Sequence, residues 1–153
     1  MFIHAHQALA IHQSGAEVFA LISDPTKESQ WNPAVLKTER LSEQPSGIGT
    51  VYQETHHVIF RQNTMTFEVV SYQPDAQFGT KTLSGGPLQI SQYTLGSHPD
   101  GVQVTLSIDI QIPGLFRFLA PLLRRIAGKG ALQSLTRLKL FLENERASAP
   151  SPM

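Results

Sequence analysis

Glu54 and His56 are the two residues of this chain whose types and spacing best suit acid/base chemistry. Side chains two positions apart on a β-strand point to the same side of a sheet, and a carboxylate beside an imidazole can transfer a proton in a buried site. Tyr52 has the same spacing, so its hydroxyl falls on that face as well. These three residues are therefore the candidate catalytic residues. The alternative is that this face is exposed to solvent, or that Glu54 and His56 only hydrogen-bond each other.

A second pair with strand spacing, His4 and His6, raises the question of a metal site together with His56 or His57. His4 and His6 alternate with apolar residues, so we expect them on the solvent side of a strand. No third ligand stands at a motif spacing. The chain has no cysteine, which excludes disulfides, zinc–thiolate sites and a cysteine nucleophile. We therefore predict neither a metal nor a cofactor.

The overall composition is that of a globular domain without a bias toward a charged partner. The chain has 153 residues and a formal net charge of zero, and it lacks a dense Lys/Arg stripe, so we expect no nucleic-acid partner. No signal peptide and no apolar run long enough to span a membrane is found, so we predict a cytoplasmic protein without stable membrane insertion. We expect a single domain over 1–146 and a disordered tail over 147–153. The sequence does not predict the oligomeric state.

The first third of the chain predicts a strand followed by two short helices. Residues 2–11 alternate as a strand does. Ser14 and Glu17 then have the spacing of a capping box, which predicts a helix over 15–22. Asp24-Pro25 begins a second short helix, which must end near Trp31 because Pro33 disfavours helix at the residue before it. Trp31 then either guards the mouth of a cavity or fills the junction between helix and sheet.

Six stretches of strand-like composition follow, each separated from the next by a short turn signal. They cover 35–43, 49–60, 64–73, 76–84, 88–97 and 102–111. Separators this short join only antiparallel neighbours, so we expect a meander of hairpins.

The turns also predict which side chains share a face. Two-residue turns at Pro74-Asp75 and Pro99-Asp100 fix the registers of two hairpins. The resulting pairs are Phe67 with Thr82, Val69 with Thr80, Tyr93 with Leu106 and Leu95 with Val104. An even-numbered loop near Gln62 adds Tyr52, Glu54, His56, Val58, Phe60 and Met65 to the same face. An odd-numbered loop would instead add Val51, Gln53, Thr55, His57 and Ile59. We favour the even loop because it groups the apolar residues.

The stretch from Pro113 to Glu145 predicts a long helix with more apolar surface than it can bury alone. Ala131, Leu135, Leu138 and Leu142 share one helical face. A sheet with one apolar face and a long apolar helix predict an α+β domain in which the sheet wraps the helix. Pro121 and the run Gly128-Lys129-Gly130 favour a kinked lid over the cavity. The alternative is a helix that lies on a membrane surface, because Arg117, Arg124, Arg125 and Lys129 are interspersed.

The order of these elements, with several short motifs, is similar to a known family. The motifs are Ala16-Glu17-Val18-Phe19 through Asp24-Pro25, Trp31-Asn32-Pro33, Gly47-Ile48-Gly49-Thr50, Glu68 to Pro74, Gly86-Pro87, Asp100-Gly101-Val102 and Leu135 to Lys139. From about residue 3 to 144 the chain resembles the START-like (Bet v 1-like, SRPBCC) superfamily, in its polyketide cyclase/dehydrase-like branch. The resemblance implies a helix-grip fold: a curved antiparallel sheet of about seven strands around a long C-terminal helix, with two short helices after the first strand. It also implies a cavity between sheet and helix, which relatives use for lipids, polyketides or hormones.

We therefore predict a protein that binds a hydrophobic or amphipathic small molecule or lipid. A wider form of the hypothesis is that it also transports this ligand. The predicted ligand-binding residues are Trp31, Tyr52, His56, Phe67, Phe78, Thr80, Tyr93, Leu106, Phe118 and Leu122. The first alternative is a polyketide cyclase/aromatase-like enzyme using Glu54, His56 or Tyr52. The second is a protein-interaction module whose apolar helix face docks a partner.

Overall fold

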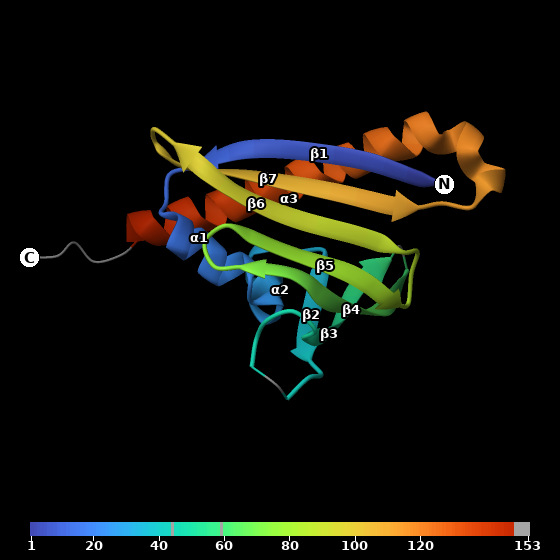
Figure 1. The fold of residues 1–153 in the computed structure, drawn as a ribbon, viewed down its shortest axis with the longest axis horizontal. Coiled ribbons are helices and arrows are strands. Elements are labelled where there is room, and N and C mark those ends of the chain that lie inside the picture. The colour runs from blue at the N-terminus through green and yellow to red at the C-terminus, as the bar shows by residue number, and fades with distance from the viewer. Residues whose placement is uncertain (44, 59, 149–153) are drawn as a thin grey trace, which may run out of the picture.

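A curved antiparallel sheet wraps around one long C-terminal helix in the computed structural model, which describes residues 1–43, 45–58 and 60–148 (Figure 1). Within that part of the chain the sheet has seven strands in the order β1-β7-β6-β5-β4-β3-β2. The strands are β1 (Phe2–Ile11), β2 (Val35–Arg40), β3 (Val51–Val58), β4 (Arg61–Gln73), β5 (Gln77–Ser84), β6 (Gln89–His98) and β7 (Gly101–Gln111). The helices are α1 (Gly15–Ile22), η1 (Pro25–Lys27), α2 (Glu28–Trp31), η2 (Gly114–Leu119) and α3 (Ala120–Ser148). This is the predicted helix-grip fold.

The two short helices begin at the predicted caps. The Ser14 hydroxyl accepts a hydrogen bond from the backbone N–H of Glu17 at 3.2 Å, which satisfies one of the free donors at the start of α1. The Asp24 carboxylate accepts from the backbone N–H of Thr26 at 3.2 Å, with Pro25 in the first helical position of η1. α2 ends at Trp31, before Pro33. These caps hold Glu28 and Trp31 against the sheet.

The hairpin registers agree with the prediction at the pairs that matter for the site. Tyr93 opposes Leu106 and Leu95 opposes Val104. Phe67 opposes Thr82 and Val69 opposes Thr80, although the β4–β5 turn is one residue longer than expected. A β-bulge between Val69 and Ser71 offsets the extra residue and restores the predicted pairing beyond it.

The turn between β3 and β4 lies earlier than predicted. Val58 pairs with Arg61, so the turn directly follows Val58 and does not lie near Gln62. It is still an even-numbered turn, and Tyr52 therefore opposes Phe67 while Glu54 opposes Met65. Phe60 was predicted to point inward and this was wrong: it lies in the turn and is fully exposed. Ile59 falls outside the described residues.

α3 is continuous from Ala120 to Ser148, which corrects the prediction of a helix broken at Pro121 and at Gly128. Pro121 stands in the first turn, where its missing N–H removes no helical hydrogen bond. Gly128 is buried where α3 passes β1, with the side chains of Ala5 and Gln7 as its neighbours. The tail expected to be disordered from residue 147 therefore begins inside α3, and 149–153 fall outside the described residues.

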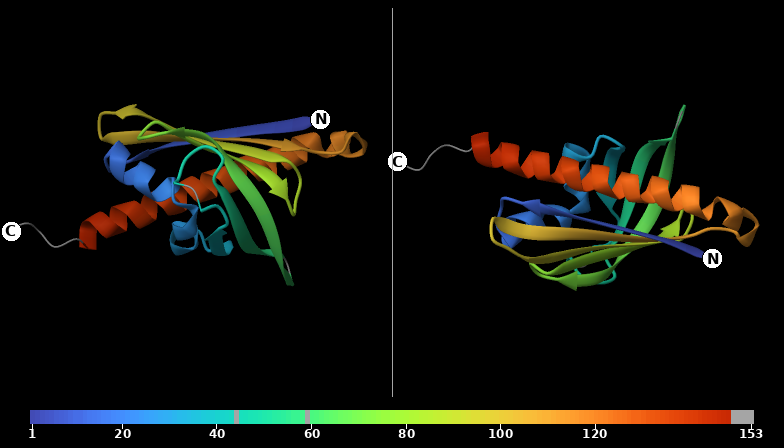
Figure 2. Two further views of the ribbon diagram at one scale, coloured as in Figure 1. Left: turned by 60° about the horizontal axis from the view of Figure 1, so that its bottom comes forward. Right: turned by 90° about the horizontal axis from the view of Figure 1, so that it is seen from above.

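The second half of α3 is the part that the sheet grips (Figure 2). Leu135 and Leu138 are completely buried, and both belong to one cluster with Val104 of β7 and Val18 of α1. The Gln13 side-chain amide adds a buried polar contact by donating a hydrogen bond to the Leu142 carbonyl at 2.8 Å. A helix of this kind is held by packing and not by its own propensity. In the described part of the chain, no helix is long and apolar enough to cross a membrane.

Candidate ligand cavity

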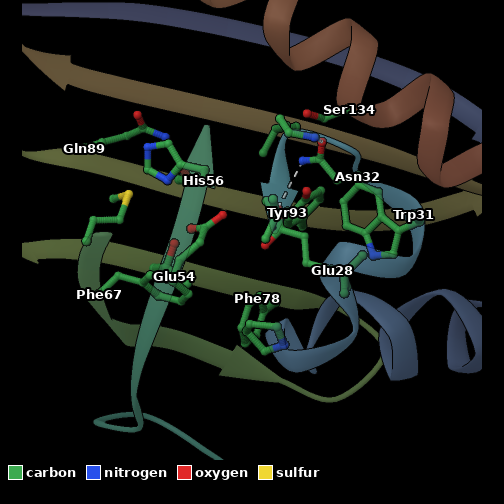
Figure 3. Close-up of a pocket in the computed structure, with 18 of the residues that line it drawn as sticks. Glu28, Trp31, Asn32, Glu54, His56, Phe67, Phe78, Gln89, Tyr93 and Ser134 are labelled. Atoms are coloured by element: carbon green, nitrogen blue, oxygen red, sulfur yellow. Dashed lines mark hydrogen bonds between the residues drawn. The ribbon is translucent and has the colours of Figure 1, made fainter. Parts of the chain in front are cut away.

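A cavity of about 330 Å³ lies between the inner face of the sheet, the helices α1 and α2, and one turn of α3 (Figure 3). Its wall is largely apolar. The apolar and aromatic lining includes Trp31, Met65, Phe67, Phe78, Leu106 and Ile108. α3 contributes Ser134, one turn before the buried Leu138. The side chains that line the cavity thus come from elements far apart in the sequence.

Two glutamates lie on the wall of the cavity, Glu28 from α2 and Glu54 from β3. Asn32 holds the first, because its side-chain amide donates a hydrogen bond to Glu28 Oε1 at 3.3 Å. Asn32 is itself fixed, since its Oδ1 accepts from the backbone N–H of Ala34 at 3.2 Å and from Arg137 Nη1 at 3.5 Å. Figure 3 shows the Glu54 carboxyl directed into the pocket from the β3 side, with Tyr93 and Glu28 on the facing wall.

Both carboxyl groups ionise with difficulty. The pKa of Glu28 is raised from 4.5 to about 8, mainly by burial and also by the charge of Glu54, while the hydrogen bond from Asn32 acts to lower it. Burial likewise raises the pKa of Glu54. Tyr93 lines the same cavity, and burial followed by the charges of the two glutamates raises the pKa of its hydroxyl. At neutral pH the pair therefore keeps a proton, and Tyr93 stays neutral.

His56 is a further polar residue of the wall. Asn63 Nδ2 lies 3.4 Å from His56 Nε2 and donates to the Gly85 carbonyl at 3.1 Å. An amide N–H beside Nε2 favours the tautomer in which Nδ1 carries the proton and Nε2 accepts. Gly85 has a φ of 88°, and a Cβ there would lie 2.2 Å from the Thr64 carbonyl oxygen, so glycine is required in the turn that supports this contact.

A family model described as "Polyketide cyclase / dehydrase and lipid transport" matches residues 3–143 of the chain. The protein belongs to this family. No curated protein matches the sequence. The solved structures that share the fold of this polyketide cyclase/dehydrase and lipid transport family member include aromatase/cyclases and a protein described as a START superfamily protein.

Three of these structures show the range of the fold. The di-domain aromatase/cyclase StfQ of the steffimycin pathway has a TM-score of 0.79 at 13% identity, over 97% of this chain and 53% of that one. This chain thus spans about half the length of that di-domain protein. A START superfamily protein from Mycobacterium smegmatis has a TM-score of 0.73 at 17% identity, over 89% of this chain and 93% of that one. Ara h 8.0201 has a TM-score of 0.71 at 10% identity, over 94% and 99%. At these identities the likeness concerns the fold alone.

The structure of this family member brings most of the predicted ligand-binding residues together. The residues among them that line the cavity are Trp31, His56, Phe67, Phe78, Thr80, Tyr93 and Leu106. Trp31 is 6% exposed and packs in the core, so it fills the helix–sheet junction and forms cavity wall at once. Of the candidate catalytic residues, Glu54 and His56 line the cavity.

Three predicted residues do not line it. Tyr52 is on the expected face but is 2% exposed and stacks on Phe67, with ring centroids 5.6 Å apart. It is a core residue behind the wall. Phe118 and Leu122 lie on the molecular surface, 73% and 53% exposed. The reason is the unbroken helix: without a kink at Gly128, the start of α3 does not fold back over the cavity.

Glu28 and Asn32 line the cavity and were not among the predicted site residues. The usable signal was the spacing of Glu28 from Trp31. Residues three apart share a helical face, so a Trp31 that faces the cavity brings Glu28 with it.

The N-terminal histidines lie where solvent exposure was expected. His4 and His6 are exposed, and His4 pairs with Asp109 on the neighbouring strand β7 at 2.5 Å. Within the described residues, no group of three or more His, Asp or Glu side chains is arranged to hold a metal ion.

Proposed function

We propose that this protein binds an apolar or amphipathic small molecule in the cavity between the sheet and the helices. The observation that carries the proposal is a partly open cavity of about 330 Å³ whose wall combines apolar and aromatic side chains with hydroxyl, amide, imidazole and carboxyl groups. Binding pockets for small molecules begin at about this size, and they join apolar walls to polar groups that orient the ligand. Membership in a family described in part by lipid transport is consistent with it.

The charges on the wall narrow the chemistry of the ligand. Among the described residues that line the cavity, three are acidic (Asp24, Glu28 and Glu54) and none is Lys or Arg. A buried carboxylate ligand would face these acids without a cation to pair with, which is costly. We therefore infer that the ligand carries a neutral hydroxyl or carbonyl, or a basic nitrogen.

Three alkyl probes of equal length test this proposal: decanol, decylamine and decanoate. Trp31 is the chain's only tryptophan and lines the cavity, so its fluorescence reports occupancy. Decanol and decylamine should change the emission and raise the melting temperature. Decanoate should bind at least about tenfold more weakly, because an unpaired buried charge costs about 1.4 kcal/mol or more.

A cavity-filling variant supplies the control. Ser91→Phe places a large side chain in the cavity and should abolish binding. Gln92→Phe introduces the same residue on the opposite face of β6 and should leave binding intact. Absence of binding by all three probes, or equal binding to folded Ser91→Phe, would refute the proposed function.

A second candidate function is proton-transfer catalysis in the same cavity. The observation that favours it is that Glu54 and His56 line one wall opposite Glu28, whose pKa of about 8 lets it keep a proton at neutral pH and release it to a stronger base. Cyclisation or dehydration of a bound polyketide-like molecule needs such a donor. Once a substrate is identified, Glu54→Gln and His56→Ala should each lower kcat by about a hundredfold or more. Unchanged turnover in both variants would leave binding as the only function.

A further inference from the structure

Five large apolar side chains are exposed on η2 and the first turns of α3, and four of them are more than half exposed. Leu115 is 79% exposed, Phe118 73%, Leu122 53% and Ile126 58%. We call these four residues the apolar ridge. Figures 1 and 2 show that η2 and the start of α3 extend past the end of the sheet, beside the N-terminus. Met1 and Phe2, each about half exposed, lie at the same end.

The apolar ridge is part of neither the buried core nor the wall of the cavity. None of its residues belongs to either buried cluster of the protein, and none lines the cavity described above. Scattered single apolar residues on a surface are ordinary, but a contiguous exposed group marks an interaction site.

The segment that carries the ridge has positive charges and no negative ones. Arg117, Arg124, Arg125 and Lys129 lie in the same segment, and the sequence has no Asp or Glu between Asp109 and Glu143. In the described part of the chain, none of these four cations forms an ion pair. Arg124, Arg125 and Lys129 also line a shallow groove between α3 and β1. The whole chain is neutral, so this end of the molecule concentrates positive charge.

We propose that η2 and the start of α3 dock on an anionic lipid bilayer. Leu122 and Ile126 are one helical turn apart and project outward, with Arg125 and Lys129 beside them, so the apolar side chains can enter the acyl boundary while the cations stay at the headgroups. The excess of Arg and Lys selects an anionic surface over a zwitterionic one. The same charge argues against a second copy of this chain as the occupant, since two ridges in contact would bring eight cations together. The proposal does not depend on what the cavity holds.

Flotation with phosphatidylcholine vesicles, with and without a third of phosphatidylglycerol, tests the proposal on the full chain. We expect binding to the anionic vesicles only, and its loss at high salt because screening weakens exposed charges. Arg125→Glu/Lys129→Glu should weaken binding at least about 25-fold, roughly fivefold per cation lost. Phe118→Ser/Leu122→Ser should weaken it at least about tenfold, because both side chains would bury apolar area in the bilayer.

Matched variants separate docking from general effects of charge and polarity. Lys37→Glu/Arg61→Glu changes the net charge equally at β2 and β4, and Leu140→Ser removes an exposed leucine (54% exposed) farther along α3. Both should bind as the unmodified protein does, and circular dichroism should show every variant folded. Equal binding to zwitterionic vesicles, or no loss in the ridge variants, would overturn the proposal. So would a dimer in solution that Phe118→Ser/Leu122→Ser converts to monomer without any vesicle binding, since the ridge would then be a protein interface.

Discussion

Two glutamates and Asp24 share the wall of a cavity to which no described Lys or Arg contributes, and this imbalance gives the site its chemical character. Glu28 is stabilised in its neutral form by burial and by Glu54, while Asn32 works in the opposite direction by donating to the charged form. Because the two glutamates interact, the proton that they keep at neutral pH belongs to the pair. The other carboxyl group of the pair can be ionised. It can accept a hydrogen bond from a ligand or pair with a basic nitrogen.

The contribution of Glu54 to this arrangement is directly measurable. Glu54→Gln removes its negative charge, so the pKa of Glu28 should fall from about 8 while staying above the ordinary 4.5, because burial is the larger cause of its shift. Titration of the glutamate carboxyl carbons by NMR in labelled protein measures this. Glu68→Gln is the control: Glu68 follows Phe67 on β4 and therefore points to the opposite face of the sheet. A pKa of Glu28 unchanged by Glu54→Gln would show that the two side chains do not interact.

At the level of single residues, the two-residue spacing along strands predicted which side chains face the site. The three-residue spacing of Glu28 and Trp31 in α2 was not used, and Glu28 was missed. Alternation along β3 and the turn at Pro99 correctly placed Glu54 and Tyr93 on one face. Thr80 is on that face as well, but only because a β-bulge offsets the longer turn at Pro74. Tyr52 shows the limit of such reasoning, because facing inward does not distinguish a cavity wall from the packed core behind it. That distinction depends on the volume of neighbours from distant elements, here Phe67 against the Tyr52 ring.

Among the elements, α3 divides into a buried half and an exposed half. The stretch from Ala131 to Leu142 packs one face against the sheet, and Leu135 on that face is 0% exposed. Leu135→Ala should therefore lower the free energy of unfolding by about 2–5 kcal/mol, because it leaves a cavity in a packed core. Leu140→Ala, the same change at a 54% exposed position, should stay within about 0.5 kcal/mol of the unmodified protein. Denaturant unfolding measures both, and similar losses in the two variants would contradict the burial of one face of this stretch and the exposure of the other.

The turn after β5 supports the site through its glycine. Gly85→Ala combines a left-handed φ of 88° with a Cβ 2.2 Å from the Thr64 carbonyl, so we expect a loss of about 1–3 kcal/mol in unfolding free energy. Gly86→Ala changes the adjacent glycine, where a Cβ meets nothing within 4 Å, and should have little effect. The His56 ring resonances should shift in Gly85→Ala only, because Asn63 connects His56 to the Gly85 carbonyl. Equal effects of the two changes would rule out this role of the turn.

The order and type of the elements could be predicted because each one carries its own local signal. Ser14 and Glu17 start α1, and short turns impose the antiparallel meander. The start of α3 could not be predicted correctly, because Pro121 breaks a helix in its interior but is tolerated in its first turn, and only the true first residue distinguishes the two cases. Because α3 also runs through Gly128 without a break, Phe118 and Leu122 lie on the surface and do not cover the cavity.

At the scale of the whole molecule, the buried glutamates couple stability to pH. Glu28 has a pKa of about 8 in the folded protein against 4.5 when unperturbed, so between these values the folded state keeps a proton that the unfolded state has lost. The unfolded state then binds fewer protons, and the free energy of unfolding falls as pH rises, by about 1.4 kcal/mol per pH unit for one group. The raised pKa of Glu54 acts in the same direction. The stabilisation from this source is fully present below pH 4.5 and is lost as pH rises through about 8.

Urea unfolding from pH 5 to pH 8 tests this coupling, with Glu28→Gln as the decisive variant. Glutamine is neutral at every pH and still offers Asn32 a carbonyl acceptor, so the slope of unfolding free energy against pH should flatten by up to about 1.4 kcal/mol per unit. The free energy of unfolding of the variant, compared with that of the unmodified protein, should rise most at the alkaline end of the range. Glu43→Gln alters an exposed loop carboxylate and should reproduce the unmodified profile. If Glu28→Gln retained the full slope, the proton would not reside on Glu28, and the charge that we assign to the cavity would have to be revised.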